Sequence, residues 1–275
     1  MNRNDAKYLS HYRKVNSYWP AIFLAIVTLT GAAFLWWLIS QLGNFPSFIL
    51  PTPLDVWNRF VMSIDDGSLL RHTLVTLQEI LLGLALGVSV ATVLGYFLAK
   101  SRTFEKLISP YIVASQSVPI VAIAPILIIW FGPGIFSKIL ICSLIVLFPV
   151  LVNTVVGLRS IPEELRDLMR SLKSTRWQTI SKLEIPGALP VFLGGLRIGA
   201  TLSVIGAVVG EFVGSDKGLG FLINLGRGQY DTALVFVSVF TLIIMAMALY
   251  GIVVLLEKRL LSWQQCTNQT IPENK

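Results

Sequence analysis

Six long apolar stretches constrain this chain more than any other feature of its sequence. They lie near residues 21–41, 72–99, 110–131, 138–158, 191–213 and 233–256. Each is close to the roughly 20 apolar residues that a helix needs to cross a bilayer. In lipid a spanning helix must satisfy its backbone hydrogen bonds internally, so we expect six transmembrane helices. The composition agrees, because only 13% of residues are charged. We therefore predict an all-α membrane protein.

The basic residues outside these stretches fall mainly on one side of the membrane. Lys and Arg are abundant before the first stretch, between the second and third, after the sixth, and above all from Arg159 to Lys182. Cytoplasmic loops are enriched in these residues, so both termini and the 159–190 loop are predicted to be cytoplasmic. This topology explains the net charge of +7, and we expect no nucleic-acid binding.

We predict one transmembrane domain with short polar ends. Residues 1–18 form a cytoplasmic N-terminal arm, residues 19–263 the transmembrane domain with its cytoplasmic loop 159–190, and residues 264–275 a cytoplasmic tail. The first apolar stretch is too long for a signal-peptide core and is interpreted as a retained span.

The most distinctive local pattern is a polar segment between Ser160 and Pro190. Inside it four apolar residues recur at i, i+3, i+4 and i+7, namely Leu165, Leu168, Met169 and Leu172. This spacing predicts a short amphipathic helix. Because so short a helix is not stable alone in water, we expect it to dock onto a cytoplasmic partner. The alternative is that the stripe packs against the helix ends of its own chain.

Two capping-box patterns accompany this segment. Ser160 with Glu163 precedes the amphipathic stripe, and Thr175 with Gln178 precedes a second short helix. In such a box the first side chain accepts a hydrogen bond from the backbone three residues on, and the second side chain bonds back. We therefore predict a helix start at each pair.

Charged residues inside a span are costly and are candidates for function. Three qualify: Glu79, Arg197 and Glu211. Glu79 either faces a translocation path or pairs with a polar neighbour such as Gln116. Arg197 lies near the inner edge of its span, where its side chain is expected to reach the headgroups. Glu211 either lines the path or caps the Gly-rich segment that follows.

Small residues four apart allow helix backbones to approach closely in lipid. They occur as three glycine pairs, Gly83 with Gly87, Gly195 with Gly199, and Gly206 with Gly210. We interpret them as intramolecular packing surfaces, with a dimer seam as the alternative.

The sequence holds no pattern expected of an enzyme. It contains no Gly-x-x-x-x-Gly-Lys-Ser/Thr loop for ATP, and its two histidines have no neighbours at metal-ligand spacing. We therefore expect no catalytic residues, metal or cofactor in this chain.

The polar segment resembles the EAA loop of ABC-importer permeases, which dock onto a separate ATPase. Asp167, Leu168 and Met169 stand at the Glu-Ala-Ala positions, Lys173 at the Gly, and Leu183, Ile185 and Pro186 at the Ile-x-Leu-Pro end. Lys173 departs from the family pattern, where glycine suits a left-handed turn. The resemblance implies that the ATPase is contacted by Glu164, Asp167, Leu168, Met169, Arg170, Leu172, Lys173 and Pro186.

Further segments resemble the nitrate, sulfonate and taurine branch of that family. They are Phe48–Pro53, Gln116–Gly132, Gly195–Gly199 and Gly218–Gly220. The resemblance implies a type I importer fold with six helices and a second permease copy, as a homodimer or heterodimer. It also implies ABC ATPase subunits, an external substrate-binding protein, and membrane lipid around the spans, with a path lined by residues such as Glu79, Gln116 and Glu211.

The substrate is expected to be a vitamin heterocycle. The branch includes permeases for riboflavin and for a thiamine-precursor pyrimidine, and Ser115–Pro119 resembles those members. Relatives that carry sulfonates often have Arg where this chain has Glu79. A path without embedded cations, apart from the inner Arg197, attracts a sulfonate or nitrate poorly. The alternatives are sulfonate, taurine or nitrate import, and, as another class, an ATP-independent secondary transporter.

Overall fold

The computed structural model describes residues 18–43 and 45–262, and every regular element in that part of the chain is helical. The predicted N-terminal arm and C-terminal tail lie almost wholly outside the described residues. The helices, in chain order, are α2 (Tyr18–Leu42), α3 (Pro53–Asp65), α4 (Ser68–Lys100), α5 (Arg102–Gln116), α6 (Ile120–Phe131), α7 (Ile135–Arg159), α8 (Glu163–Ser171), α9 (Arg176–Thr179), a π-helical turn (Ile180–Glu184), α10 (Ile185–Gly214), α11 (Leu219–Gly228) and α12 (Thr232–Leu260).

Four of the described helices are long and apolar enough to cross a membrane. They are α4, α7, the continuous helical segment Arg176–Gly214, and α12; Ile26–Leu42 and α6 are shorter apolar helices. The four long helices and Ile26–Leu42 lie at five of the six predicted spans. The stretch 110–131 was wrongly expected to be one helix. It is divided between α5 and α6 at Ser117–Pro119, because Pro119 takes an extended backbone and caps α6.

Helix α7 lies at the centre of the bundle, between α4 and α10. Glycines on both neighbours bring the backbones close to α7: a Cβ added at Gly206 would lie 2.8 Å from Cys142 Cα, and one at Gly87 would lie 2.8 Å from the Ser143 carbonyl oxygen. A Cβ at Gly83 would also collide with Cys142. The prediction of intramolecular glycine packing is therefore confirmed at these positions, where substitution would separate the helices.

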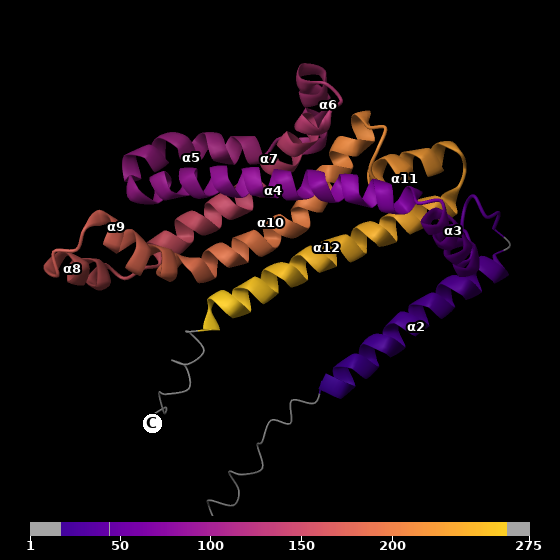
Figure 1. Cartoon of the computed structure of the whole chain (residues 1–275), viewed down its shortest axis with the longest axis horizontal. Coiled ribbons are helices and arrows are strands. Elements are labelled where there is room, and N and C mark those ends of the chain that lie inside the picture. Colours follow the sequence, from indigo (N-terminus) through magenta and orange to yellow (C-terminus); the bar gives the residue numbers. More distant parts are fainter. Residues whose placement is uncertain (1–17, 44, 263–275) are drawn as a thin grey trace, which may run out of the picture.

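The long helices run roughly along the molecule, with different elements gathered at its two ends (Figure 1). Helices α8 and α9 lie at one end, where α4 finishes and α10 begins. Helices α3 and α11 lie at the other end, where α4 and α12 begin. By the charge pattern of the loops, the first end is cytoplasmic and the second is external.

Helix α3 covers part of the outer end and begins at a complete capping box. Thr52 Oγ1 accepts from the Asp55 backbone N–H at 3.2 Å, and Asp55 Oδ2 accepts from the Thr52 N–H at 3.0 Å. Arg59 of α3 then donates to Asp231, the N-cap of α12, at 2.7 Å. These bonds hold α3 against the start of α12.

Candidate functional site

Helix α8 presents its apolar stripe to solvent. Its leucines are largely uncovered, with 43% of Leu165, 54% of Leu168 and 68% of Leu172 exposed. Met169 is half-buried, and α8 contains no buried residue. The stripe therefore does not pack against the chain's own helix ends. Exposed apolar surface of this kind marks a binding surface for another molecule.

The start of α8 differs from the prediction. Pro162 is the N-cap and offers no side-chain hydrogen bond, so the expected box of Ser160 and Glu163 is wrong. Ser160 Oγ donates instead to the Gly157 carbonyl at 2.9 Å, which makes Ser160 part of the end of α7. Ile161 is 6% exposed, and a Cβ at Gly187 would lie 2.9 Å from it. Ser160 is therefore bonded to the end of α7 and does not cap α8, while Ile161 packs beside Gly187.

The end of α8 is a Schellman turn at Lys173. The Ser174 N–H donates to the Met169 carbonyl at 3.1 Å, and the Lys173 N–H donates to the Arg170 carbonyl at 2.9 Å. Lys173 has φ of 53°, in the left-handed region. The turn thus keeps the geometry that suits glycine, although lysine occupies the position.

Helix α9 begins as the sequence predicts. The Gln178 N–H donates to Thr175 Oγ1 at 3.3 Å, and the Thr175 N–H donates to Gln178 Oε1 at 2.8 Å, which confirms the second capping box. Trp177 in this helix is 73% exposed. Sequence reasoning did not single out Trp177, although a tryptophan in a polar loop is itself a signal of a contact surface.

The loop is tied to the membrane helices by polar contacts. Arg166 donates to the Leu158 carbonyl at 2.7 Å, and Lys100 forms an ion pair with Glu184, which is 1% exposed. Glu164 lies in the exposed first turn of α8, and Pro186 lies in the first turn of α10. The α8–α9 loop is therefore held against the ends of the membrane helices by these bonds.

A second polar cluster is buried near the outer end. Glu79 of α4, Lys138 of α7 and Glu211 of α10 are 1%, 4% and 1% exposed. The Lys138 Nζ lies 3.1 Å from Glu79 Oε1 and donates to Ser215 Oγ at 2.6 Å. Glu79 therefore forms an ion pair with Lys138.

The second carboxyl of this cluster holds the start of α11. Thr76 Oγ1 donates to Glu211 Oε1 at 2.6 Å and accepts from the Leu219 N–H at 2.8 Å. Glu211 Oε2 accepts from the Gly220 N–H at 2.5 Å. His72 Nδ1 accepts from the Gly218 N–H at 2.9 Å. Glu211 thus caps the segment that follows α10, which is the second of its two expected roles.

Lys138 is the residue of this cluster that sequence reasoning missed. It lies in the first turn of α7, where its charge is expected to reach the outer surface, and the sequence gives no partner for it. Arg197 also has a protein partner, since it forms an ion pair with Glu257 of α12 and lies 5.5 Å from the Tyr250 ring centroid. Lys138 and Arg197 are therefore each paired with a carboxylate.

A groove of about 430 Å³ opens between α6, α7 and α10. It is lined by Val118, Ile120, Ile145, Phe148, Pro149, Val152, Asn153, Ile198 and Leu202. Asn153 is the single amide among these residues and donates to the Pro149 carbonyl at 2.8 Å. Gln116 ends α5, two residues before Val118. The groove is mainly apolar and carries no charged side chain.

Residues 83–262 match the family described as the binding-protein-dependent transport system inner membrane component. The chain belongs to this family. The matched region covers the central bundle, the α8–α9 loop, α11 and α12. The chain is thus an inner-membrane permease of the ABC-importer class, and the family predicted from the EAA-like loop is confirmed.

Named relatives come from the branch expected from the sequence. A riboflavin transport system permease of Chloroflexus aurantiacus is 45% identical over 90% of this chain and 91% of its own length. A formylaminopyrimidine transport permease of Halalkalibacterium halodurans is 34% identical over 83% of this chain and 91% of its own. A taurine transport permease of Escherichia coli is 29% identical, over 92% and 95%.

A solved transporter shares the fold. The inward-facing MetNI methionine ABC transporter aligns with a TM-score of 0.62 over 70% of this chain and 96% of that chain, at 18% identity. The permease thus has the type I importer fold.

Proposed function

We propose that this permease imports a vitamin heterocycle, riboflavin or a thiamine-precursor pyrimidine, using ATP hydrolysed by a separate ATPase subunit. An external binding protein delivers the substrate to the end that carries α3 and α11. A second permease copy completes the pathway. The observation that carries the proposal is the uncovered apolar stripe of α8, in a family whose description names binding-protein-dependent transport.

Helix α8 is proposed as the coupling helix. Leu168 and Leu172 are more than half exposed, and each would release roughly 1.5–3 kcal/mol on full burial in a groove of the ATPase. Asp167 and Arg170 form an ion pair of 2.8 Å on the helix surface and would orient the contact. Glu164, Met169, Lys173 and Pro186 complete the proposed contact region.

The proposed substrate class is supported by the groove between α6, α7 and α10. Its lining is aliphatic and aromatic, with Asn153 as a hydrogen-bonding group. Substrate sites for neutral ring systems combine such walls with a few polar groups. A sulfonate would instead require an uncompensated cation, yet Lys138 and Arg197 each face a carboxylate. The 45% identity to a riboflavin permease favours the same class.

The three path residues expected from the sequence take different proposed roles. Gln116 precedes Val118 of the groove, and we propose that it lies at the path. Glu79 and Glu211 are buried in the single chain, so we propose that they act beside the path, Glu211 by holding the α11 segment and Glu79 by neutralising Lys138.

The test is uptake by right-side-out membrane vesicles that contain the permease with its ATPase and are supplied with the external binding protein. Radiolabelled riboflavin, aminopyrimidine and taurine are supplied with ATP inside, with and without an uncoupler. We expect uptake of riboflavin or the pyrimidine that needs ATP and survives the uncoupler. Uptake of taurine alone would keep the ATP-driven mechanism and reject the substrate class. Uptake that follows the ion gradient without ATP would reject the importer itself.

Co-purification provides a second measurement. The permease is extracted in mild detergent from its native host, and associated proteins and small molecules are identified by mass spectrometry. An ATPase and a binding protein that carries a flavin or pyrimidine are expected. The absence of any ATPase after cross-linking would contradict the proposed coupling surface.

A further inference from the structure

A cavity of about 680 Å³ lies at the cytoplasmic end, between the last turn of α4 and the α8–α9 loop. Four cationic side chains line it, namely Lys100, Arg166, Arg170 and Arg176. The carboxyl among its lining residues is Glu184, which is already paired with Lys100. Asp167 pairs with Arg170 on the rim. The cavity therefore carries excess positive charge, and its size is that of a site for a small organic ligand.

Not all of this positive charge is satisfied within the chain. Arg166 donates through one terminal nitrogen to the Leu158 carbonyl, but its Nε is buried and has no hydrogen-bond partner. This Nε is enclosed by protein atoms, so an anion in the cavity would bond instead to the terminal nitrogens of the lining arginines. Arginine forks match the oxygen atoms of a phosphate in particular.

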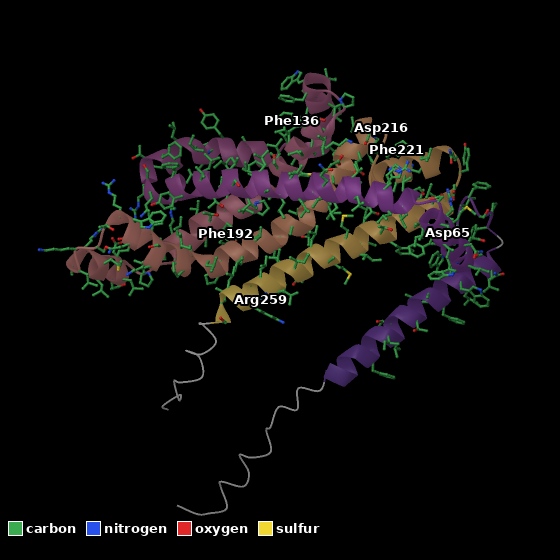
Figure 2. All side chains as sticks on the ribbon, viewed as in Figure 1. Asp65, Phe136, Phe192, Asp216, Phe221 and Arg259 are labelled. Carbon is green, nitrogen blue, oxygen red and sulfur yellow. The ribbon has the colours of Figure 1, made fainter. Side chains whose placement is uncertain are left out.

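An apolar slot continues from the cavity toward the membrane. It has a volume of about 270 Å³ and shares Tyr96, Ile180 and Glu184 with the cavity. Its remaining walls come mainly from apolar residues of α7 and α10, including Leu158, Ile185, Leu189 and Phe192. Figure 2 shows Phe192 between the α8–α9 end and the outer end, where Asp216 and Phe221 are labelled. The slot therefore extends along α10, away from the cationic cavity.

We propose that the cationic cavity and the apolar slot together bind one anionic phospholipid of the inner leaflet. Its phosphate lies among the arginines of α8 and α9, and one acyl chain enters the slot between α4, α7 and α10. Basic pockets on the cytoplasmic side of membrane helices suit such headgroups. A soluble phosphate would use the cavity but not the adjoining slot, so the paired shape favours a lipid.

The lipid site and the apolar ATPase stripe use different faces of α8, and Arg170 lies at the rim between them. At about 100° per residue, the direction shared by Arg166 and Arg170 lies roughly 145° around the helix from that of Leu165, Leu168 and Leu172. One helix face therefore turns toward the cavity while the other faces solvent. A bound lipid would support α8 from behind and leave its apolar stripe free for the partner, whatever solute the permease carries.

The test is native mass spectrometry of the full chain in mild detergent. Dioleoyl phosphatidylglycerol, dioleoyl phosphatidylcholine and glycerol 3-phosphate are added separately at equal concentrations. We expect one phosphatidylglycerol to be retained at least tenfold more tightly than phosphatidylcholine, and glycerol 3-phosphate not to be retained. Equal retention of the two lipids would overturn the proposal. Retention of glycerol 3-phosphate as tight as that of phosphatidylglycerol would assign the cavity to a soluble phosphate and also overturn it.

Variants connect the binding to this site. The double variant Arg170→Gln with Arg176→Gln removes two exposed cations of the cavity and is expected to weaken phosphatidylglycerol retention at least tenfold. The matched control, Arg71→Gln with Arg227→Gln, removes two exposed cations at the outer end and is expected to change it less than twofold. Equal loss in both variants, or in neither, would contradict the assignment.

A third variant tests the slot separately. Leu189→Trp places a larger ring in the slot without changing any charge, and it is expected to weaken phosphatidylglycerol retention several-fold. Wild-type retention in this variant would show that no acyl chain enters the slot and would overturn that part of the proposal. The charge variants remain informative if Leu189→Trp fails to fold.

Discussion

At the outer end, the backbone N–H groups that begin α11 are bonded by Thr76, Glu211 and His72 of the same chain. At the inner end, α8 leaves its leucines exposed and begins at Pro162 without a side-chain cap. The outer loop thus has its backbone N–H groups bonded within the chain. The inner loop is bonded to the membrane helices but keeps an exposed apolar surface. Bonds within the chain keep the outer loop in one conformation, whereas the exposed apolar surface of the inner loop is typical of a binding site for a partner.

The largest effect is expected from charges placed on the uncovered stripe. Leu168→Asp with Met169→Asp should lower ATP-driven uptake at least tenfold, because two carboxylates would have to be desolvated in an apolar groove of the ATPase. Uptake and ATP hydrolysis are measured in vesicles that contain the complete transporter. The membrane helices should keep their thermal unfolding midpoint.

Glu163→Lys is the control for that variant. It also changes the charge of α8 by two, but lies on the side opposite the leucines, at about 100° per residue. It should retain most of the uptake. Undiminished uptake in the Leu168/Met169 variant would remove the basis for the coupling surface.

The next largest effect is expected on the free energy of unfolding, from loss of the buried Lys138–Glu79 ion pair at the outer end. Lys138→Met leaves the buried Glu79 without its cation, and removing one partner of a buried ion pair costs about 3–5 kcal/mol. The free energy of unfolding is measured by denaturant titration in detergent micelles. The double variant with Glu79→Gln should recover most of the loss, since it removes the stranded charge. Equal stability of the single and double variants would show that the pair is not coupled.

A smaller loss is expected when the link to α11 is cut. Thr76→Val removes the oxygen that accepts from the Leu219 N–H, and a buried N–H left without a partner costs about 1–3 kcal/mol. Hydrogen exchange at α11 should accelerate. Thr241→Val is the matched control, since its hydroxyl donates only to a carbonyl of its own helix, and it should leave α11 protection unchanged. Similar hydrogen exchange at α11 in both variants would show that Thr76 does not stabilise this helix.

The smallest effect is expected at the two left-handed turns, one at each end. Lys173 and Tyr230 have φ of 53° and 59°, and each closes a Schellman turn. Glycine avoids a steric cost of about 1–2 kcal/mol there but gives back part of it in unfolded-state entropy, so Lys173→Gly should add about 0.5–1 kcal/mol. Tyr230→Gly should act in the same direction. Lys173→Ala keeps the steric cost, and a gain equal to that of glycine would attribute the effect to the lost lysine charge.

Features that depend on neighbours in sequence could be predicted. The stripe of α8 and the Thr175 cap of α9 follow from spacings of three and four residues, and the structure contains both. The glycine contacts of α4 and α10 could also be predicted, because glycines four residues apart in a membrane helix are typical of close helix packing.

Features that depend on distant parts of the chain could not be predicted. The partner of Lys138 lies on α4, and no local pattern connects Lys138 with Glu79. Ser160 bonds to the end of α7 instead of capping α8, and Ile161 beside it packs against Gly187, a contact between two separate elements. The break between α5 and α6 was marked by Pro119, but proline is common inside membrane helices, and its effect here depends on the surrounding bundle.

The helical path from Arg176 to Gly214 has a mechanical consequence. It runs through α9, the π-helical turn and α10 as one helical segment of 39 residues, or roughly 60 Å at 1.5 Å per residue. One end adjoins the α8 turn, and Glu211 lies near the other. The segment contains a π-helical turn and Pro190, and its continuous backbone joins the cytoplasmic loop to Glu211, the side chain that holds α11. One piece of backbone therefore spans the distance between the uncovered cytoplasmic loop and the outer loop that the chain completes itself.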